Sequence, residues 1–187
     1  DPVSYAQAGA DAITAPNGAN FARERGILPA MLEEFWAQRE EAKARDDALA
    51  SYTYKIIMNS FYGVLATGSC RFASDALAGA ITEFGHYVLR WAQERLQERG
   101  VRVIYGDTDS VFVDPGLADE CPAVKAQAVG TALCAEVNDE LARHIEAEYG
   151  VESHLELEFE KYYPRFLLPP MRGSQRGRAK GYAGLRG

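Results

Sequence analysis

The chain has 187 residues, of which 47% are hydrophobic, and a formal net charge of -7 at pH 7. A chain of this length and composition is globular and can bury a sizeable core, as one domain or one and a half. No stretch comes near the roughly 18 consecutive apolar residues that span a membrane, and the first residues form neither a basic leader nor an apolar signal core. We therefore expect a cytoplasmic protein with no membrane partner.

The basic residues are concentrated in the last part of the chain. From Lys161 to Gly187 there are seven basic residues and no acidic one, so the first 160 residues carry a formal charge of -14. A run of this kind is usually a solvated surface. Because it is mixed with glycine and aromatic residues, in MRGSQRGRAKGYAGLRG, it also suits a polyanionic partner.

Cysteine and histidine show no pattern of a disulfide or zinc site. The three cysteines are odd in number and far apart in the sequence, which argues against a disulfide framework. The three histidines lack the spacing of metal ligands, such as His-x-x-x-His. We expect reduced cysteines that pack in the fold and no histidine metal ligand.

The first half of the chain predicts irregular structure followed by three helices. Residues 1–25 are rich in Ala, Gly, Pro and Asn and indicate an irregular connection. Apolar residues at helical spacing predict one helix over residues 27–46 and another over 49–65, joined by a short loop into a helical hairpin. A third helix is expected over residues 75–98 and ends before Gly100, which suits a C-cap.

The second half predicts a β-hairpin, a long helix and further strand. Residues 101–116 contain two runs of β-branched and aromatic residues on either side of Gly-Asp-Thr-Asp. A helix is expected over residues 121–149. The strict alternation of HLELEFEK, residues 154–161, predicts an antiparallel strand. The segment YPRFLLPP, residues 163–170, is expected to continue the sheet.

Asp107 and Asp109 lie one residue apart at the turn of the predicted β-hairpin. Side chains alternate along a strand, so residues two apart project to the same side. Two like charges this close repel unless a cation lies between or beside them. Aspartate is also a common turn residue that bonds its own backbone. The triplet alone leaves two interpretations open, turn chemistry or a hard-cation site that holds Mg²⁺ or Mn²⁺ with substrate phosphates.

Basic and polar residues share one face of each helix in the predicted helical hairpin. Arg39 and Lys43 are four residues apart on the first helix, and Lys55, Asn59 and Tyr62 follow at i, i+4 and i+7 on the second. If the helices are antiparallel, these faces converge on an anion with several phosphates, which Arg binds as a planar fork and Lys as a point charge. From these residues alone, an ordinary solvated surface is the more common explanation.

Two motifs together are far more specific than either motif alone. Lys55-x-x-x-Asn59-Ser60-x-Tyr62-Gly63 is followed, further along the chain, by Tyr105-Gly106-Asp107-Thr108-Asp109-Ser110. This combination resembles the fingers helix and the catalytic palm hairpin of family B DNA polymerases. The likeness extends from about Gly26 through LELEFE to KGYAGL.

The resemblance implies an α+β fold. Helical-hairpin fingers would join a palm that has an antiparallel sheet backed by helices, a ferredoxin-like palm that is incomplete. Residues 1–25 would be an irregular connection from the palm, residues 26–68 the fingers and residues 69–187 the palm.

The resemblance also implies roles for individual residues. Asp107 and Asp109 match the catalytic palm aspartates, with Asp109 the firmer metal ligand, and Glu160 matches a palm acid near the metals. The residues that match nucleotide-binding positions are Arg39, Lys43, Lys55, Asn59 and Tyr62. The residues that match DNA-binding positions are Gly63, Thr108, Arg178, Lys180 and Tyr182.

The implied chemistry is nucleotidyl transfer from a dNTP to a primer 3′-hydroxyl. Two divalent ions, Mg²⁺ or alternatively Mn²⁺, about 4 Å apart would clamp the attacking oxygen and the leaving pyrophosphate. The implied partners are primer-template DNA, a dNTP and, through the parent protein, a sliding clamp. The implied location is the cytoplasm, in association with the nucleoid.

Two departures from the family pattern matter. The family's Lys-Lys-x-Tyr, which grips the primer-template backbone, is here Ala179-Lys180-Gly181-Tyr182, and Arg178 would replace the missing charge. The family's other catalytic aspartate belongs to Asp-x-x-Ser-Leu-Tyr-Pro, which does not occur in this sequence. We therefore expect a fingers-and-palm fragment, without exonuclease and thumb, that does not polymerise DNA alone.

Two other functions stay open at this level. Asp-x-Asp also serves metal-dependent sugar-nucleotide transferases, which predict a doubly wound parallel sheet rather than a tight antiparallel hairpin. A non-catalytic nucleic-acid-binding module agrees with the basic residues near the end of the chain and with the missing aspartate.

Overall fold

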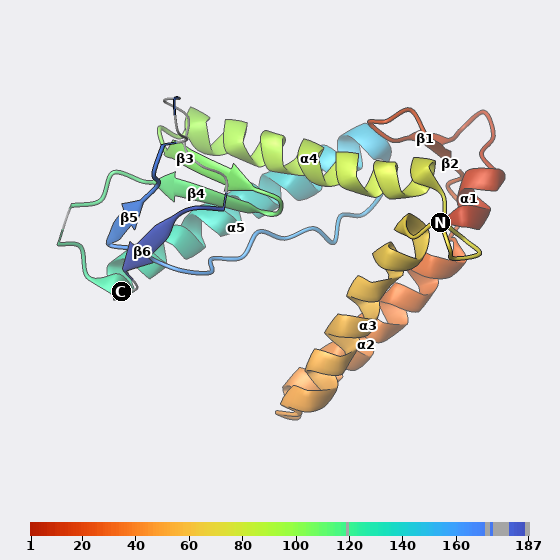
Figure 1. The fold of residues 1–187 in the computed structure, drawn as a ribbon, viewed down its shortest axis with the longest axis horizontal. Coiled ribbons are helices and arrows are strands. Elements are labelled where there is room, and N and C mark those ends of the chain that lie inside the picture. Colours follow the sequence, from red (N-terminus) through yellow and green to blue (C-terminus); the bar gives the residue numbers. More distant parts are fainter. Residues whose placement is uncertain (119, 171–172, 174–179, 186–187) are drawn as a thin grey trace. The chain divides into compact units, whose positions relative to one another are not determined.

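The computed structural model describes residues 1–118, 120–170, 173 and 180–185. The chain forms two compact units, Asp1–Tyr87 and Val88–Gly187. The described elements are helices and two-stranded antiparallel sheets (Figure 1), in agreement with the predicted α+β class. None of the described helices has both the length and the apolar character of a membrane span.

Residues 1–25 contain more regular structure than the sequence predicted. A short helix, α1 (Pro2–Ala6), is followed by the strands β1 (Ile13–Thr14) and β2 (Asn20–Phe21), which pair with each other. The Asp1 carboxylate caps α1 by accepting hydrogen bonds from the N–H groups of Val3 and Ser4. Composition did not indicate these elements, because α1 depends on a cap and the strands on a two-residue pairing.

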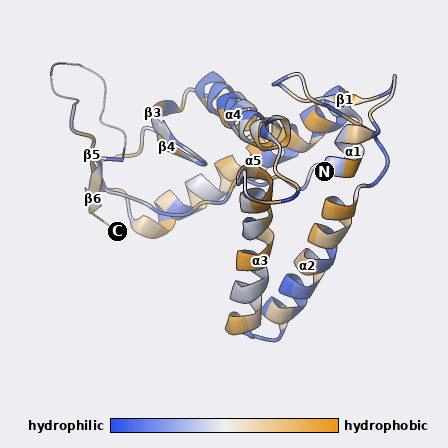
Figure 2. Cartoon of the chain, turned by 45° about the vertical axis from the view of Figure 1, so that its right-hand side comes forward, coloured by the Kyte–Doolittle hydropathy of each residue, from blue (hydrophilic) through white to orange (hydrophobic). Residues whose placement is uncertain are grey.

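The predicted helical hairpin is present in the first unit. It consists of α2 (Ile27–Ala44) and α3 (Ala48–Ala66), which lie side by side (Figure 1). The Phe35 ring stacks on Tyr54 and on Phe61, in each case with ring centroids 6.2 Å apart. The connection between the helices is hydrophilic (Figure 2), and Asp47 in it caps α3 by accepting a hydrogen bond from Ala50 N–H. Both predicted helices are confirmed.

The third predicted helix is also confirmed, as α4 (Asp75–Glu98). Its first half contributes Ala80 to a small core with Ala15 and Ala19, against which Phe21 and Phe84 pack. The division between the two compact units falls within this helix. The assignment of residues 26–68 to fingers and 69–187 to a palm stays a prediction.

The core of the second unit forms between a β-hairpin and two helices. The strands β3 (Arg102–Asp107) and β4 (Ser110–Asp114) pair antiparallel, and α5 (Ala123–Tyr149) follows them. The buried residues of this core are Ala92, Leu96, Val101 and Val137. The Arg99 guanidinium, at the end of α4, reaches Glu140 at 2.6 Å and Glu136 at 3.3 Å on α5. Partial desolvation by itself would lower the pKa of Arg99. The charged hydrogen bonds to Glu140 and Glu136 outweigh this effect, so the pKa of Arg99 lies above its ordinary value.

One predicted strand pairs differently from expected. Residues 163–170 contain β5 (Arg165–Leu167), but β5 pairs with β6 (Ala183–Leu185) rather than with the β3–β4 hairpin. The described strands therefore form three separate two-stranded sheets instead of one. Aromatic side chains join two of these sheets, since the rings of Phe112 on β4 and Phe166 on β5 stack with centroids 5.0 Å apart.

The predicted strand over residues 154–161 is wrong, because these residues form no strand. The Leu157 N–H donates to Asn138 Oδ1 at 2.7 Å, and Asn138 Nδ2 donates to the Leu157 carbonyl at 3.0 Å. Nearby, a Cβ atom added at Gly130 of α5 would overlap the Phe159 ring. The alternation in the sequence thus reflects one apolar side packed on a helix, with the glutamates Glu156 and Glu158 on the exposed side. A helix buries such a side without any partner strand.

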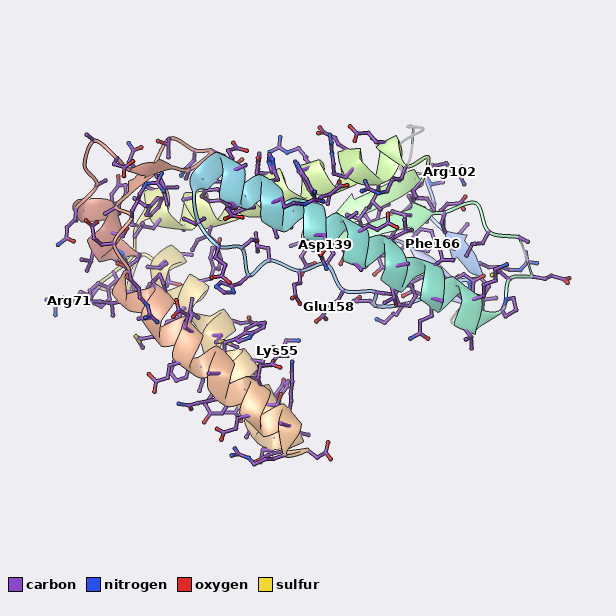
Figure 3. The ribbon with its side chains drawn as sticks, turned by 180° about the vertical axis from the view of Figure 1, so that it is seen from behind. Lys55, Arg71, Arg102, Asp139, Glu158 and Phe166 are labelled. Carbon is purple, nitrogen blue, oxygen red and sulfur yellow. The ribbon has the colours of Figure 1, made fainter. Side chains whose placement is uncertain are left out.

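We predict that Asn138 anchors this segment. Asn138→Ala leaves the N–H and C=O of Leu157 without their partners in part-buried surroundings, so the free energy of unfolding falls by about 1–3 kcal/mol in urea denaturation. The matched control is Asp139→Ala, at the exposed neighbouring position of α5 (Figure 3), which changes it by less than about 0.5 kcal/mol. Equal effects of the two substitutions would contradict the anchoring role.

Candidate functional site

The two aspartates singled out by the sequence lie at the tip of the β3–β4 hairpin, which we call the acidic hairpin (residues 102–114). Asp107 pairs with Ser110, so the loop between the strands has only two residues, Thr108 and Asp109. Val103, Val111 and Val113 pack against the buried core of the second unit. The strands are therefore fixed by hydrophobic packing, and the tip carries the carboxylates at a defined place.

The carboxylates differ in their surroundings. The Asp107 side chain is 25% exposed and accepts a hydrogen bond from Thr108 Oγ1 at 3.1 Å. Asp109 is exposed and accepts a hydrogen bond from Ser110 Oγ at 3.3 Å. Each carboxylate therefore keeps oxygen lone pairs that neighbouring hydroxyl groups do not use.

The backbone at the tip adopts a conformation that a β-branched residue disfavours. Thr108 has φ of 53°, in the left-handed region. Glycine is the residue that usually occupies positive φ in a two-residue hairpin loop. The hairpin therefore keeps Thr108 in a strained conformation between the two acids.

The donor set at the tip fits a magnesium or manganese ion. Both ions prefer carboxylate oxygens, and magnesium is usually held by one or two carboxylates together with substrate phosphates rather than by a complete protein cage. Among the described residues, no group of three or more acidic, histidine or cysteine side chains is placed so that it could hold a metal ion by itself. Glu160, which is exposed, is thus not joined with Asp107 and Asp109 into such a group.

The cations of the helical hairpin differ in how they are held. The Arg39 guanidinium lies 5.6 Å from the Trp36 ring centroid, and its buried Nε has no hydrogen-bond partner in the described part of the chain. Lys43 Nζ pairs with Glu40 Oε1 at 2.6 Å. Lys55 projects from α3 (Figure 3) and forms no ion pair or hydrogen bond with the described part of the chain. Lys55 is therefore the cation most available to an added anion.

The convergence of these cations stays a prediction. Phe35 stacks on Tyr54, so Arg39, one turn beyond Phe35, and Lys55, next to Tyr54, belong to the same part of the helical hairpin. No contact among the described residues links the charged groups of Arg39, Lys43 and Lys55 to one another.

The remaining predicted residues of α3 lie on its exposed surface. Asn59 is exposed, and the Tyr62 hydroxyl is 3.4 Å from Thr82 Oγ1. A Cβ atom added at Gly63 would meet nothing within 4 Å. Packing within the chain therefore does not require glycine at this position.

The structure brings Lys180 to the acidic hairpin, a contact that no local sequence pattern indicated. Lys180 Nζ lies 4.0 Å from Asp107 Oδ1, and the Lys180 N–H donates a hydrogen bond to Tyr105 Oη at 2.9 Å. The Tyr182 ring contacts Phe112 with centroids 4.8 Å apart. Tyr105 belongs to the second motif, and the resemblance implies no role for it. Arg178, another predicted DNA-binding residue, lies outside the described residues.

Comparison with known proteins places the chain in a family. The model of DNA polymerase family B matches residues 10–170. This chain belongs to DNA polymerase family B. The family predicted from the two motifs is therefore confirmed.

Individual members of DNA polymerase family B support this assignment. The motifs also predicted a likeness to bacterial DNA polymerase II, and that of Escherichia coli (strain K12) is 43% identical over 166 residues, 88% of this chain and 21% of that protein. The DNA polymerase delta catalytic subunit of Candida albicans is 29% identical over 176 residues, 82% of this chain and 16% of that protein.

A solved structure agrees with the family assignment. The family B DNA polymerase from the hyperthermophilic archaeon Pyrobaculum calidifontis matches with a TM-score of 0.59 and 25% identity, over 94% of this chain and 21% of that chain. This family B chain thus spans about a fifth of the length of that polymerase and of the E. coli enzyme.

The strand pairing argues against a sugar-nucleotide transferase. That function predicted a doubly wound parallel sheet, whereas every pairing among the described strands is antiparallel. The Asp-x-Asp triplet of this family B chain begins at the last residue of β3 and continues into the two-residue hairpin loop, and it does not follow a parallel strand.

We predict that Thr108→Gly relieves strain in the acidic hairpin. Glycine adopts positive φ without steric cost, and this gain offsets its larger loss of backbone entropy on folding. The free energy of unfolding, from urea denaturation, is expected to stay unchanged or to rise by up to about 1 kcal/mol.

The control for this prediction is Thr131→Gly, at an exposed position in α5. Glycine within a helix lowers the free energy of unfolding by roughly 0.5 kcal/mol. A decrease of the same size or larger for Thr108→Gly would show that Thr108 is not strained.

Proposed function

We propose that the full-length protein carrying this chain is a DNA-directed DNA polymerase that transfers the nucleotidyl group of a dNTP to a primer 3′-hydroxyl. The observation that carries the proposal is the ordered pair of motifs, the Lys55 helix and the Asp107–Asp109 hairpin, within a chain whose residues 10–170 match DNA polymerase family B. Primer-template DNA and a dNTP are its substrates. A sliding clamp and a location at the nucleoid belong to the same proposal.

In this proposal the acidic hairpin is part of the palm. Asp107 and Asp109 would hold the divalent ion, Mg²⁺ or Mn²⁺, and Glu160 would lie near it. When bound, the ion supplies charge that stabilises the attacking and leaving oxygens of the transferred phosphate. The unused carboxylate oxygens of both aspartates and the fixed position of the hairpin support this role.

In this proposal the helical hairpin is the fingers. Arg39, Lys43 and Lys55 would bind the triphosphate, with Asn59 and Tyr62 beside them. The Lys55 ammonium supports this role, because it has no partner among the described residues and keeps its hydrogen-bond donors for phosphate oxygens. Arg39 Nε also has no partner among those residues, but it is buried, so it would reach a phosphate only after a shift of the side chain. Gly63 would lie near the nascent base pair, in keeping with the open space around its Cα.

Catalysis of this kind depends on position and charge rather than on covalent chemistry by the protein. The side chains of the chain have three tasks. They orient the triphosphate, hold the acids at the reacting phosphate, and offset the negative charge that develops there. Lys180, Tyr182, Thr108 and Arg178 would contact primer-template DNA, which a basic surface binds in a salt-dependent manner.

We predict that Asp109→Ala in the full-length protein abolishes primer extension. Loss of one carboxylate that holds the ion lowers the rate by at least about 10²–10³-fold, in line with the loss of one group that stabilises charge in a transition state. The measurement is single-turnover extension of a labelled primer, with primer-template affinity measured separately and expected to stay within about threefold, because the substitution leaves the cations untouched.

Asp139→Ala, which removes an exposed acid from α5, is the matched control and keeps full extension. Extension by Asp109→Ala at a rate near that of the unsubstituted protein would refute the proposed role of Asp109. A non-catalytic DNA-binding module predicts a different pattern, in which the unsubstituted full-length protein binds DNA without extending a primer.

We predict that Lys55→Ala weakens nucleotide binding specifically. Removing one charge-assisted contact to a phosphate raises the KM for dNTP by roughly 10–100-fold, while the Kd for primer-template DNA is unchanged. Steady-state extension at varied dNTP and DNA titration measure the two quantities. Lys125→Ala, which removes an exposed lysine from α5, leaves both unchanged. Equal loss of DNA affinity and of dNTP affinity would contradict a triphosphate role for Lys55.

A further inference from the structure

We propose that the Tyr105 hydroxyl is a positioning group for Lys180, so that one cation faces both the acidic hairpin and a phosphate of the DNA backbone. The inference rests on the proposed function, because its ligand is a backbone phosphate of primer-template DNA. It adds a role for Tyr105 and explains how a residue far from the acidic hairpin in sequence is held beside it.

The hydrogen bond to Tyr105 fixes the backbone of Lys180. The Lys180 N–H donates to Tyr105 Oη at 2.9 Å, across 75 positions of the sequence. Lys180 has φ of 58°, in the left-handed region that non-glycine residues rarely adopt. Such a conformation persists only where the surroundings hold it. The hydroxyl of Tyr105 is the partner that holds the N–H group in this conformation.

Aromatic packing fixes the hydroxyl itself. The Tyr105 ring contacts Phe112 at 5.7 Å and Tyr182 at 6.3 Å between centroids. Phe112 in turn stacks on Phe166 of β5, with ring centroids 5.0 Å apart. The aromatic cluster thus joins the β3–β4 hairpin to the β5–β6 sheet. The Tyr105 ring is part of this cluster, and its hydroxyl accepts the hydrogen bond from Lys180.

The result is a cation at a set separation from an acid. Lys180 Nζ lies 4.0 Å from Asp107 Oδ1, beyond hydrogen-bond distance, and the Lys180 side chain is 74% exposed. At this separation the ammonium partly offsets the charge of Asp107 and keeps its own donors free for a second oxygen ligand. A phosphate of DNA that approaches the acidic hairpin would otherwise be repelled by the aspartates, and Lys180 offsets that repulsion.

The test is primer-template binding to the full-length protein, measured by fluorescence anisotropy in EDTA over a series of KCl concentrations. Lys180→Ala weakens binding and reduces the slope of log K against log salt by about 1, the value for one phosphate contact. Tyr105→Phe weakens binding by roughly two- to tenfold, the range for one lost hydrogen bond, and reduces the slope in the same direction. In the Lys180→Ala background, Tyr105→Phe has no further effect on Kd.

The matched control is Tyr163→Phe, which removes a hydroxyl from the same aromatic cluster and leaves the affinity and the slope unchanged. An unchanged slope for Tyr105→Phe, or effects of the two substitutions that add, would overturn the positioning role while leaving the proposed function intact. An unchanged salt slope for Lys180→Ala would show that Lys180 does not contact a DNA phosphate, and would overturn the inference. Absence of primer-template binding by the unsubstituted protein would instead overturn the proposed function.

Discussion

Asp107 and Asp109 place two carboxylates one residue apart in sequence at the tip of a hairpin that hydrophobic packing holds in position. In water, two such like charges repel weakly, but the repulsion grows when a substrate displaces the water. The strands cannot relieve it by moving, because Val103, Val111 and Val113 are packed in the core of the second unit. A cation with oxygen ligands relieves the repulsion without any movement of the backbone.

Other contacts in the second unit hold its helices and the segment after α5 together. Arg99 links α4 to α5 through two glutamates, and Asn138 holds the segment that follows α5 by bonding both backbone groups of Leu157. A site that works by position needs such a support, because displacement by about 1 Å costs a large part of the rate. The strained Thr108 between the acids fits the same pattern, since strain is tolerated where function requires a particular geometry.

The sequence predicted the elements whose signal is local. Helical periodicity identified α2, α3, α4 and α5 to within a few residues, and the β-branched runs identified β3 and β4. The alternation over residues 154–161 led to a wrong prediction of a strand. Alternation indicates that one side of a segment is buried, but not whether a strand or a helix covers that side, and here a helix covers it. The pairing of β5 with β6 was also missed, since register between distant segments leaves no mark on either segment alone.

In the candidate site, too, features with a local sequence signal could be predicted, whereas contacts between distant segments could not. Spacing singled out Asp107 and Asp109 but left turn chemistry and a metal site open, and only the resemblance to the family favoured a metal site. The comparisons confirm the family, while the metal role of the two acids stays a prediction. The contact of Lys180 with Asp107 and Tyr105 depends on folding across 75 positions and has no local signal. The roles of Arg39, Lys43 and Lys55 stay predictions, because their shared ligand is not a feature of the helices themselves.

In the function proposed above, the acids and the cations act on one metal-nucleotide ligand of the full-length protein, and Mn²⁺ binding followed by electron paramagnetic resonance measures this coupling. In the full-length protein, a dNTP is expected to tighten Mn²⁺ binding at least fivefold, and by linkage Mn²⁺ tightens dNTP binding by the same factor. This coupling is expected to vanish in both Asp109→Ala and Lys55→Ala. A Mn²⁺ affinity that does not change when the dNTP is added, or a coupling that persists in both variants, would contradict a ligand shared by the acids and the cations.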